Sequence, residues 1–275
     1  MNPKQKIIED QKAWAKSKGL SFDPKGYVGD TETNLRRPLS ACAVKGFNRG
    51  AGSELAGHMK ALHSSSALVA NFFDYWTGRD KNGLLYGLGI DAYNAESLEF
   101  EAKFPTGLGG TPPHLDVAMT LSSGAVIGIE SKFTEHMGRS TKDKSKFEPS
   151  YFPHSGGLWA YVGLPGCQRL AEELHDGRHK FDYLDPWQLL KHALGLATQL
   201  HDQFGLYYLY YDYPGERAET HKREIWNFVS RVGEEIRFKA VSYQEVFGRL
   251  NTFHQADAEY PDYIDYLGTR YFPAT

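Results

Sequence analysis

Residues 114–135 read HLDVAMTLSSGAVIGIESKFTE, and this stretch decides the fold. Val, Ile and Leu recur on both sides of the sequence Ser-Ser-Gly at residues 122–124, which predicts two buried strands joined by a tight turn. A three-residue hairpin loop commonly places a glycine in the left-handed conformation after a type I turn, and Gly124 fits that position. We therefore expect an antiparallel hairpin within a larger sheet.

The length of the turn decides which side chains meet across the hairpin. Because alternate side chains point to opposite faces of a strand, a three-residue loop places Asp116 directly opposite Glu130, with their Cβ atoms about 5 Å apart. Lys132 then lies one pleat further along the same face. A two-residue loop would instead place Asp116 opposite Ser131, on the wrong face. The interpretation therefore depends on this register.

Two carboxylates that face each other in an apolar sheet repel unless a cation neutralises them. Hard oxygen ligands at this spacing favour Mg²⁺, with Mn²⁺ as a substitute, and these ions keep several waters and take phosphate oxygens. A nearby lysine orients or deprotonates a water, or stabilises charge on a phosphate. Asp116 and Glu130 are thus candidate metal ligands and catalytic residues, together with Lys132. The alternative is a surface hairpin with a chance salt bridge.

The order Asp116, then Glu130-Ser131-Lys132 on the next strand, resembles the PD-(D/E)xK nuclease superfamily, in its restriction-endonuclease-like branch. Pro113 lies three residues before the aspartate rather than directly before it. The resemblance implies an α/β fold with a restriction-endonuclease-like αβββαβ core, in which a mixed central sheet is flanked by helices. It also implies a Mg²⁺-dependent endonuclease of the restriction type, which hydrolyses DNA phosphodiester bonds.

Further residues extend the candidate site. Residues 98–104 alternate apolar and charged side chains, which predicts a half-buried strand. If this strand pairs with the Asp116 strand, Glu101 is a third metal ligand or a water-orienting base; otherwise Glu101 lies on a solvated face. Asp185 and the proline after it begin a helix. By resemblance, Gln188 or Lys191 of that helix contributes a polar side chain to the site.

The superfamily often carries an acidic residue on its first core helix as well. The sequence predicts a helix that begins at Ser53 and ends before Gly78, or two shorter helices broken near residues 63–66. Its Glu54 and Asp74 lie near opposite ends, and neither is a convincing candidate. The sequence also contains two groups of basic residues. The first is Arg36, Arg37, Lys45 and Arg49, and the second is Arg139, Lys142, Lys144 and Lys146. Each group either contacts phosphates or is simply solvated.

The composition limits the class of protein. The chain has 275 residues, two cysteines and a formal net charge of -3. This charge argues against nonspecific coating of nucleic acid, but it is compatible with a nuclease that has one basic face. Two cysteines argue against a disulfide framework and a cysteine-rich zinc site. Without an apolar signal core or a membrane-spanning run, we expect a cytoplasmic protein that does not enter a membrane.

The expected organisation has three parts, which are an N-terminal helix and basic loop at residues 1–52, a nuclease-like domain at 53–250 with an insertion at 134–185, and a tail at 251–275 packed on that domain. The alternative function is a catalytically silent member of the same fold that binds nucleic acid or a partner protein. A carbohydrate-active enzyme, indicated by abundant Tyr and Trp, leaves the lysine beside the acidic pair unexplained. The sequence leaves open the choice between DNA and RNA, and whether the chain forms a homodimer.

Overall fold

A five-stranded sheet forms the centre of the molecule. The computed structural model describes residues 2–50, 54–92, 94–138, 147–153 and 156–273. The strand order is β1-β2-β3-β4-β5, with β1 Ala95–Lys103, β2 His114–Leu121, β3 Val126–Lys132, β4 Phe204–Tyr210 and β5 Lys239–Ser242. The first three strands pair antiparallel, whereas β3, β4 and β5 run parallel. The predicted mixed sheet is confirmed.

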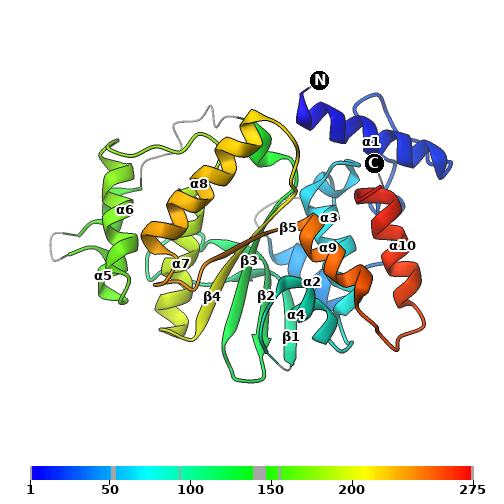
Figure 1. Ribbon diagram of the computed structural model, residues 1–275. Coiled ribbons are helices and arrows are strands. Elements are labelled where there is room, and N and C mark those ends of the chain that lie inside the picture. Colours follow the sequence, from blue (N-terminus) through cyan, green and yellow to red (C-terminus); the bar gives the residue numbers. More distant parts are fainter. Residues whose placement is uncertain (1, 51–53, 93, 139–146, 154–155, 274–275) are drawn as a thin grey trace.

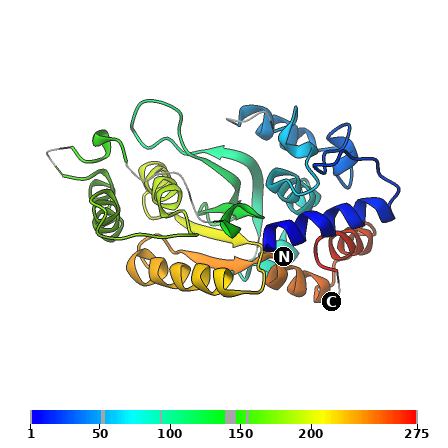
Figure 2. The same cartoon turned by 90° about the horizontal axis from the view of Figure 1, so that it is seen from above.

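Helices cover both faces of this sheet (Figure 1, and Figure 2 from above). One face carries α5 Leu158–Tyr161, α6 Pro165–His175, α7 Pro186–Leu200 and α8 Glu216–Val232. The other carries α2 Ala41–Arg49, α3 Ser65–Phe73, α4 Asn82–Leu88 and α9 Tyr243–Thr252, with α1 Pro3–Ser17 and α10 Tyr260–Tyr271 outside them. Short 3-10 helices are η1 Glu32–Asn34, η2 His58–Lys60, η3 Asp74–Trp76, η4 Glu135–Met137 and η5 Pro149–Tyr151. The order α3, β1–β3, α7, β4 matches the expected αβββαβ core.

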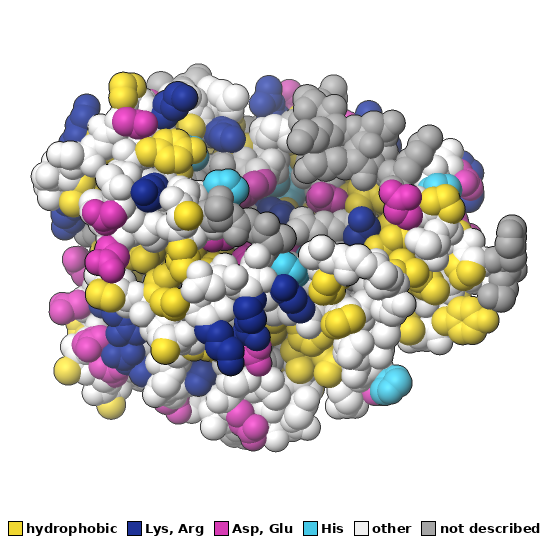
Figure 3. All heavy atoms as spheres, turned by 180° about the vertical axis from the view of Figure 1, so that it is seen from behind, with side chains coloured by type: hydrophobic (Ala, Val, Ile, Leu, Met, Phe, Trp, Pro, Cys, Tyr) yellow, Lys and Arg dark blue, Asp and Glu magenta, His cyan; other side chains and the backbone are white. Residues whose placement is uncertain are grey.

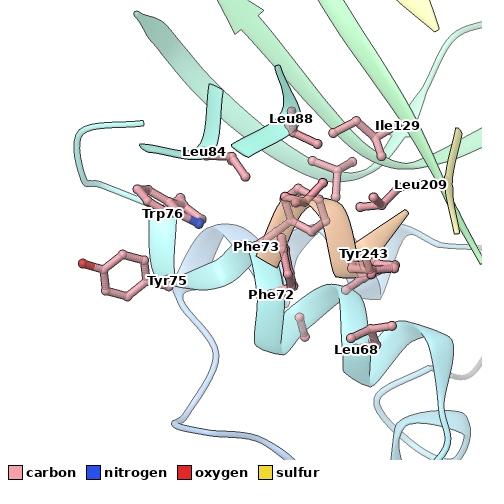
Figure 4. Packing of buried hydrophobic residues seen from close by; sticks show 14 of the residues in the cluster. Leu68, Phe72, Phe73, Tyr75, Trp76, Leu84, Leu88, Ile129, Leu209 and Tyr243 are labelled. Carbon is pink, nitrogen blue, oxygen red and sulfur yellow. The ribbon is translucent and has the colours of Figure 1, made fainter. Parts of the chain in front are cut away.

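Two hydrophobic cores hold these layers to the sheet. In the first, Phe72 of α3 packs edge-on against Tyr243 of α9 at 5.0 Å between ring centroids, below Ile129 of β3 and Leu209 of β4 (Figure 4). In the second, the apolar stripe of α7 packs on the inner side chains of β4, including Leu206. Burial of these side chains stabilises each layer by roughly 2 kcal/mol per large residue.

The helix predicted from residue 53 to before Gly78 is wrong in its long form. Ser53 lies outside the described residues. Residues 54–64 form turns and η2, and α3 begins only after Ser64, whose side chain accepts a 3.2 Å hydrogen bond from Ala67 N. The start of α3 therefore agrees with the alternative of a break near residues 63–66, since the Ser64 cap outcompetes helix continuation.

The apolar side chains of α8 divide between the core and the surface. Ile225 and Phe228 are buried, whereas Trp226 is 71% exposed and Val229 is 37% exposed. Successive residues of a helix are about 100° apart, so four apolar positions this close together cannot all face one neighbour.

The N-terminal and C-terminal segments pack on each other and on the central domain. Arg270 of α10 is 1% exposed and donates hydrogen bonds to Asn34 O (2.7 Å) and to Gln11 Oε1 of α1 (3.1 Å). The tail thus forms a docked helix, and its aromatic residue Tyr263 is fully buried. The division at residues 52 and 250 stays a prediction.

Two remaining expectations concern surfaces. The basic residues Arg139, Lys142, Lys144 and Lys146 lie outside the described residues. Within the described ranges, no helix combines the length and the apolar character that a membrane span needs.

Candidate functional site

The hairpin between β2 and β3 has the register on which the sequence argument depends. Leu121 N donates to Ala125 O at 2.8 Å and Gly124 N donates to Leu121 O at 2.9 Å, which closes a three-residue loop. Gly124 has a φ of 85°, the left-handed value expected there. The paired residues include Val117 and Ile129, and the next pair in this register is Asp116 with Glu130.

The two carboxylates and the lysine lie close together at the end of β3. Glu130 is 2% exposed, and the Lys132 side chain is 16% exposed. Lys132 Nζ donates to Glu130 Oε1. Asp116 Oδ2 accepts a 2.7 Å hydrogen bond from Ser131 N, which fixes the aspartate against the neighbouring strand. The register and the contact between Lys132 and Glu130 agree with the sequence prediction, and the role of these three residues as a site stays a prediction.

Burial and charge separate the pKa values of the two acids. Burial and the nearby Glu130 raise the pKa of Asp116 well above its usual range, against the opposing effect of Lys132. Burial also acts to raise the pKa of Glu130, but Lys132 and His192 outweigh it and bring the pKa to about 2. Burial acts to lower the pKa of Lys132, yet Glu130 and Asp116 raise it above its usual value. The site therefore holds a charged lysine and a charged Glu130.

Gln188 reaches the site from α7, as expected by resemblance. The helix begins at the cap Asp185, whose side chain accepts a 3.1 Å hydrogen bond from Gln188 N. Gln188 Oε1 accepts a 2.9 Å hydrogen bond from Lys132 Nζ. The other candidate, Lys191, instead places its ammonium 5.8 Å from the Phe147 ring centroid. Gln188 thus orients the lysine, and Lys191 does not take that role.

Glu101 lies on β1 in the position opposite Asp116, since the pairs on either side of it are Phe100 with Val117 and Ala102 with Leu115. Its side chain is 14% exposed, with Oε2 at 3.4 Å from His114 Nδ1, so the solvated-face alternative is wrong for this residue.

The backbone of Glu101 is unusual. Its φ of 50° is rare for a residue with a side chain, and such conformations cluster at functional sites. Phe100 belongs to the first core and Ala102 to the second, so the strand changes the face it presents at this point. Burial, and then the charges of Glu54 and Glu130, raise the pKa of Glu101 to about 7. Glu101 therefore belongs to the same acidic pocket.

The sequence argument missed two members of the site. His192 of α7 is 2% exposed and places Nε2 at 2.9 Å from Glu130 Oε2. Its position one helical turn after Gln188, on the same polar stripe, was the available signal. The second is Glu54, which the sequence alone does not make a convincing candidate. It lies in the turn before α3, where Ser66 Oγ donates to it and where its charge acts on Glu101.

The donor set fits a magnesium ion. Among the described residues, no group of three or more His, Cys, Asp or Glu side chains is arranged to hold a metal. However, Mg²⁺ is commonly held by one or two carboxylates together with waters and substrate phosphates. Glu130 Oε2 is buried with His192 Nε2 at 2.9 Å, and Asp116 Oδ2 accepts a hydrogen bond from Ser131 N. Asp116 and Glu130 thus offer the two carboxylates that such an ion needs.

A comparison with protein families decides the family. A family model described as restriction endonuclease associating with ARP matches residues 5–272. The chain belongs to this restriction endonuclease family. Neither curated proteins nor solved structures gave a match. The family's name agrees with the resemblance carried by Asp116, Glu130 and Lys132, and with a mixed five-stranded sheet between helices. Membership in the restriction endonuclease family makes a nuclease the function class against which the site is judged.

Proposed function

We propose that this chain is a Mg²⁺-dependent endonuclease that hydrolyses DNA phosphodiester bonds at the Asp116–Glu130 pair. One observation carries the proposal. In the hairpin register the buried Glu130 and the half-buried Asp116 lie side by side, and a single lysine is bonded to Glu130, in a member of a restriction endonuclease family. A salt bridge needed only for stability would not require a second, unneutralised carboxylate in the same place.

The chain's own residues divide the work. Asp116 and Glu130 would hold the ion, which when bound polarises a phosphate and lowers the pKa of a water. Lys132 keeps its proton because its pKa is raised, so it stabilises charge on the phosphate or orients a water rather than accepting a proton. Gln188 accepts from Lys132 Nζ at 2.9 Å and fixes its direction. The nearby Glu101, with a pKa of about 7, is the residue best suited to exchange a proton with a water near neutral pH.

The test is cleavage of supercoiled plasmid DNA with Mg²⁺, with and without a chelator. Lys132→Ala should abolish cleavage, since the variant loses the only lysine bonded to Glu130 in the described site. Lys180→Ala is the matched control, because Lys180 has a side chain that is 84% exposed and lies in a different part of the chain. Cleavage that persists unchanged in Lys132→Ala would contradict the proposed nuclease site.

A catalytically silent member of the family is the second candidate, and one observation favours it. Glu130 already forms an ion pair with Lys132 and has His192 Nε2 at 2.9 Å from its second oxygen, so both of its oxygens have a partner without a metal. Calorimetric titration with Mn²⁺ distinguishes the two functions. The nuclease predicts binding that is lost in Asp116→Asn, whereas a silent module predicts no binding that depends on Asp116.

Partners follow from the same proposal. We infer that DNA is the substrate, and RNA of the same sequence is the comparison to run in the cleavage assay. The family's description names an association with ARP, so we infer a partner component of that name. A homodimer would let two sites cut both strands, and light scattering with and without DNA tests it.

A further inference from the structure

The outer face of α2 carries basic side chains at the border of the acidic pocket. Lys45 and Arg49 are both exposed. The helix lies tightly on β1, because a Cβ at Gly46 would be 2.6 Å from the carbonyl oxygen of Phe100. At the end of the helix, a Cβ at Gly50 would lie 3.0 Å from Glu101 Oε2. The basic face of α2 is therefore held in a fixed place next to the pocket.

A third basic residue lies on the strand that α2 covers. Lys103 is exposed and follows Glu101 by two positions on β1; its charge opposes the rise in the pKa of Glu101 and adds to burial in lowering the pKa of His114. Among the described residues, neither Lys45 nor Lys103 forms an ion pair. Arg49 has only a long contact, 3.9 Å from its Nη2 to Glu99 Oε2, with both side chains about half exposed. We call Lys45, Arg49 and Lys103 the basic ledge.

The other two arginines of the same segment are engaged in the fold. Arg37 Nη2 donates to Asp74 O at 3.0 Å. The Arg36 guanidinium lies 5.7 Å from the ring centroids of Tyr75 and Tyr263. The structure thus separates the basic residues of the N-terminal segment into a structural pair and an exposed group beside the site.

A polyanion such as DNA needs positive charge beside the acidic residues of the site. The chain has a net charge of -3, and the pocket collects Glu54, Glu101, Asp116 and Glu130, which repel phosphates. Figure 1 draws α2 behind the sheet, and Figure 3, seen from that side, shows Lys and Arg side chains beside a hollow that contains acidic and histidine side chains. Local positive charge at the rim offsets the repulsion and holds the backbone in position.

We propose that the basic ledge binds the backbone phosphates of DNA on the Glu101 side of the Asp116–Glu130 pair. The inference rests on the proposed function for its ligand, but it assigns a surface and three residues that the catalytic group does not include. Because phosphate contacts carry no sequence information, the ledge sets where the duplex lies rather than which sequence is cut.

The experiment measures binding of a fluorescently labelled duplex to the full chain by anisotropy, in chelator, from 50 to 200 mM salt. Each phosphate contact contributes about 0.9 to the slope of log K against log salt. The variant Lys45→Ala/Arg49→Ala/Lys103→Ala should lower the slope by about 2 to 3 and weaken binding by up to roughly 500-fold at 0.1 M salt, from about 8-fold per contact. Lys45→Arg/Lys103→Arg keeps the charges and should keep the wild-type slope.

The matched control removes three exposed lysines from the N-terminal part of the chain, Lys16, Lys18 and Lys25. It changes the net charge equally and should change the slope by less than about 0.5. If the wild type binds DNA and the ledge variant gives the same slope of log K against log salt, the proposal that the ledge binds phosphates is overturned. The proposed nuclease function is not affected by that result. A wild type that neither binds nor cleaves DNA overturns both. If the ledge variant loses binding to duplex RNA but binds duplex DNA as the wild type does, the choice of DNA as the ligand is overturned. Equal thermal melting of all variants shows that the ledge variant is folded.

Discussion

A buried histidine pair below the site makes a quantitative prediction about stability. His136 of η4 and His221 of α8 are 3% and 1% exposed, and their ring centroids are 4.5 Å apart. His221 Nε2 lies 3.0 Å from the hydroxyl of Tyr208, and His136 Nε2 lies 3.1 Å from Tyr211 O. Burial lowers the pKa of each histidine from 6.5 to about 3. The folded protein therefore holds both rings neutral at pH values well above 3.

The sign of the effect follows from proton binding. Below pH 6.5 the unfolded chain protonates each histidine, while the folded chain does not until about pH 3, so acid favours unfolding. Between the unfolded and the folded pKa, each histidine lowers the free energy of unfolding by about 1.4 kcal/mol for every pH unit of acidification. Between pH 7.5 and pH 5.5 the loss from His221 alone is about 1.4 kcal/mol, because most of that interval lies near its unfolded pKa. This is a large part of a total stability of roughly 5–15 kcal/mol.

The measurement is urea unfolding of wild type and His221→Gln at both pH values. Glutamine keeps a polar group near the Tyr208 hydroxyl but cannot take up the proton. The raised pKa of Glu101 has the opposite pH dependence, and comparing two chains that share Glu101 cancels it. The cost of the substitution should be about 1.4 kcal/mol smaller at pH 5.5 than at pH 7.5. His254→Asn, at an exposed position, is the control. A cost that is the same at both pH values refutes the reasoning.

Three further predictions concern single residues. Gln188→Ala removes only the 2.9 Å hydrogen bond that orients Lys132. It should lower the cleavage rate about 10-fold at saturating DNA, and the affinity for Mn²⁺ should change little. A loss of Mn²⁺ binding in calorimetry would contradict that role of Gln188. Gly46→Val should destabilise the fold by more than about 2 kcal/mol in urea unfolding, since its Cβ would lie 2.6 Å from Phe100 O, and wild-type stability would show that α2 does not pack there. Gly248→Ala, in α9 with open space at its Cβ, should raise stability by about 0.5–1 kcal/mol in the same assay; a loss would mean that α9 is not a regular helix there.

The parts of the fold that the sequence predicted well are those fixed by local chemistry. The three-residue turn at Gly124 sets the hairpin register, and the cap at Asp185 begins α7. Each of these signals acts within a few residues, so a single sequence contains them.

The missed elements depend on tertiary contacts. Residues 41–49 read as a turn-rich segment, yet they form α2, which Ser40 caps and which the close approach of Gly46 to β1 stabilises. Residues 82–88 begin with the turn-forming pair Asn-Gly and contain a second glycine, yet they form α4, whose apolar side chains Leu84 and Leu88 are fully buried in the first core. Glycine opposes helix by propensity, and packing reversed that preference in both segments.

The site divides in the same way. Asp116, Glu130 and Lys132 follow from pattern and register, because they lie on adjacent strands. His192 and Glu54 come from segments far apart in the sequence, and only the fold brings them to the carboxylates. The left-handed backbone of Glu101 has no signal in the sequence, since no glycine or turn residue marks it.

The most direct test of the central claim is a crystal structure of the protein with Mn²⁺, recorded with anomalous scattering. The proposed site predicts an anomalous peak at about 2 Å from a carboxylate oxygen of Asp116 and from one of Glu130, with Lys132 still bonded to Gln188. A crystal with Mn²⁺ at a concentration that supports cleavage, and with no peak between these two carboxylates, would contradict the account.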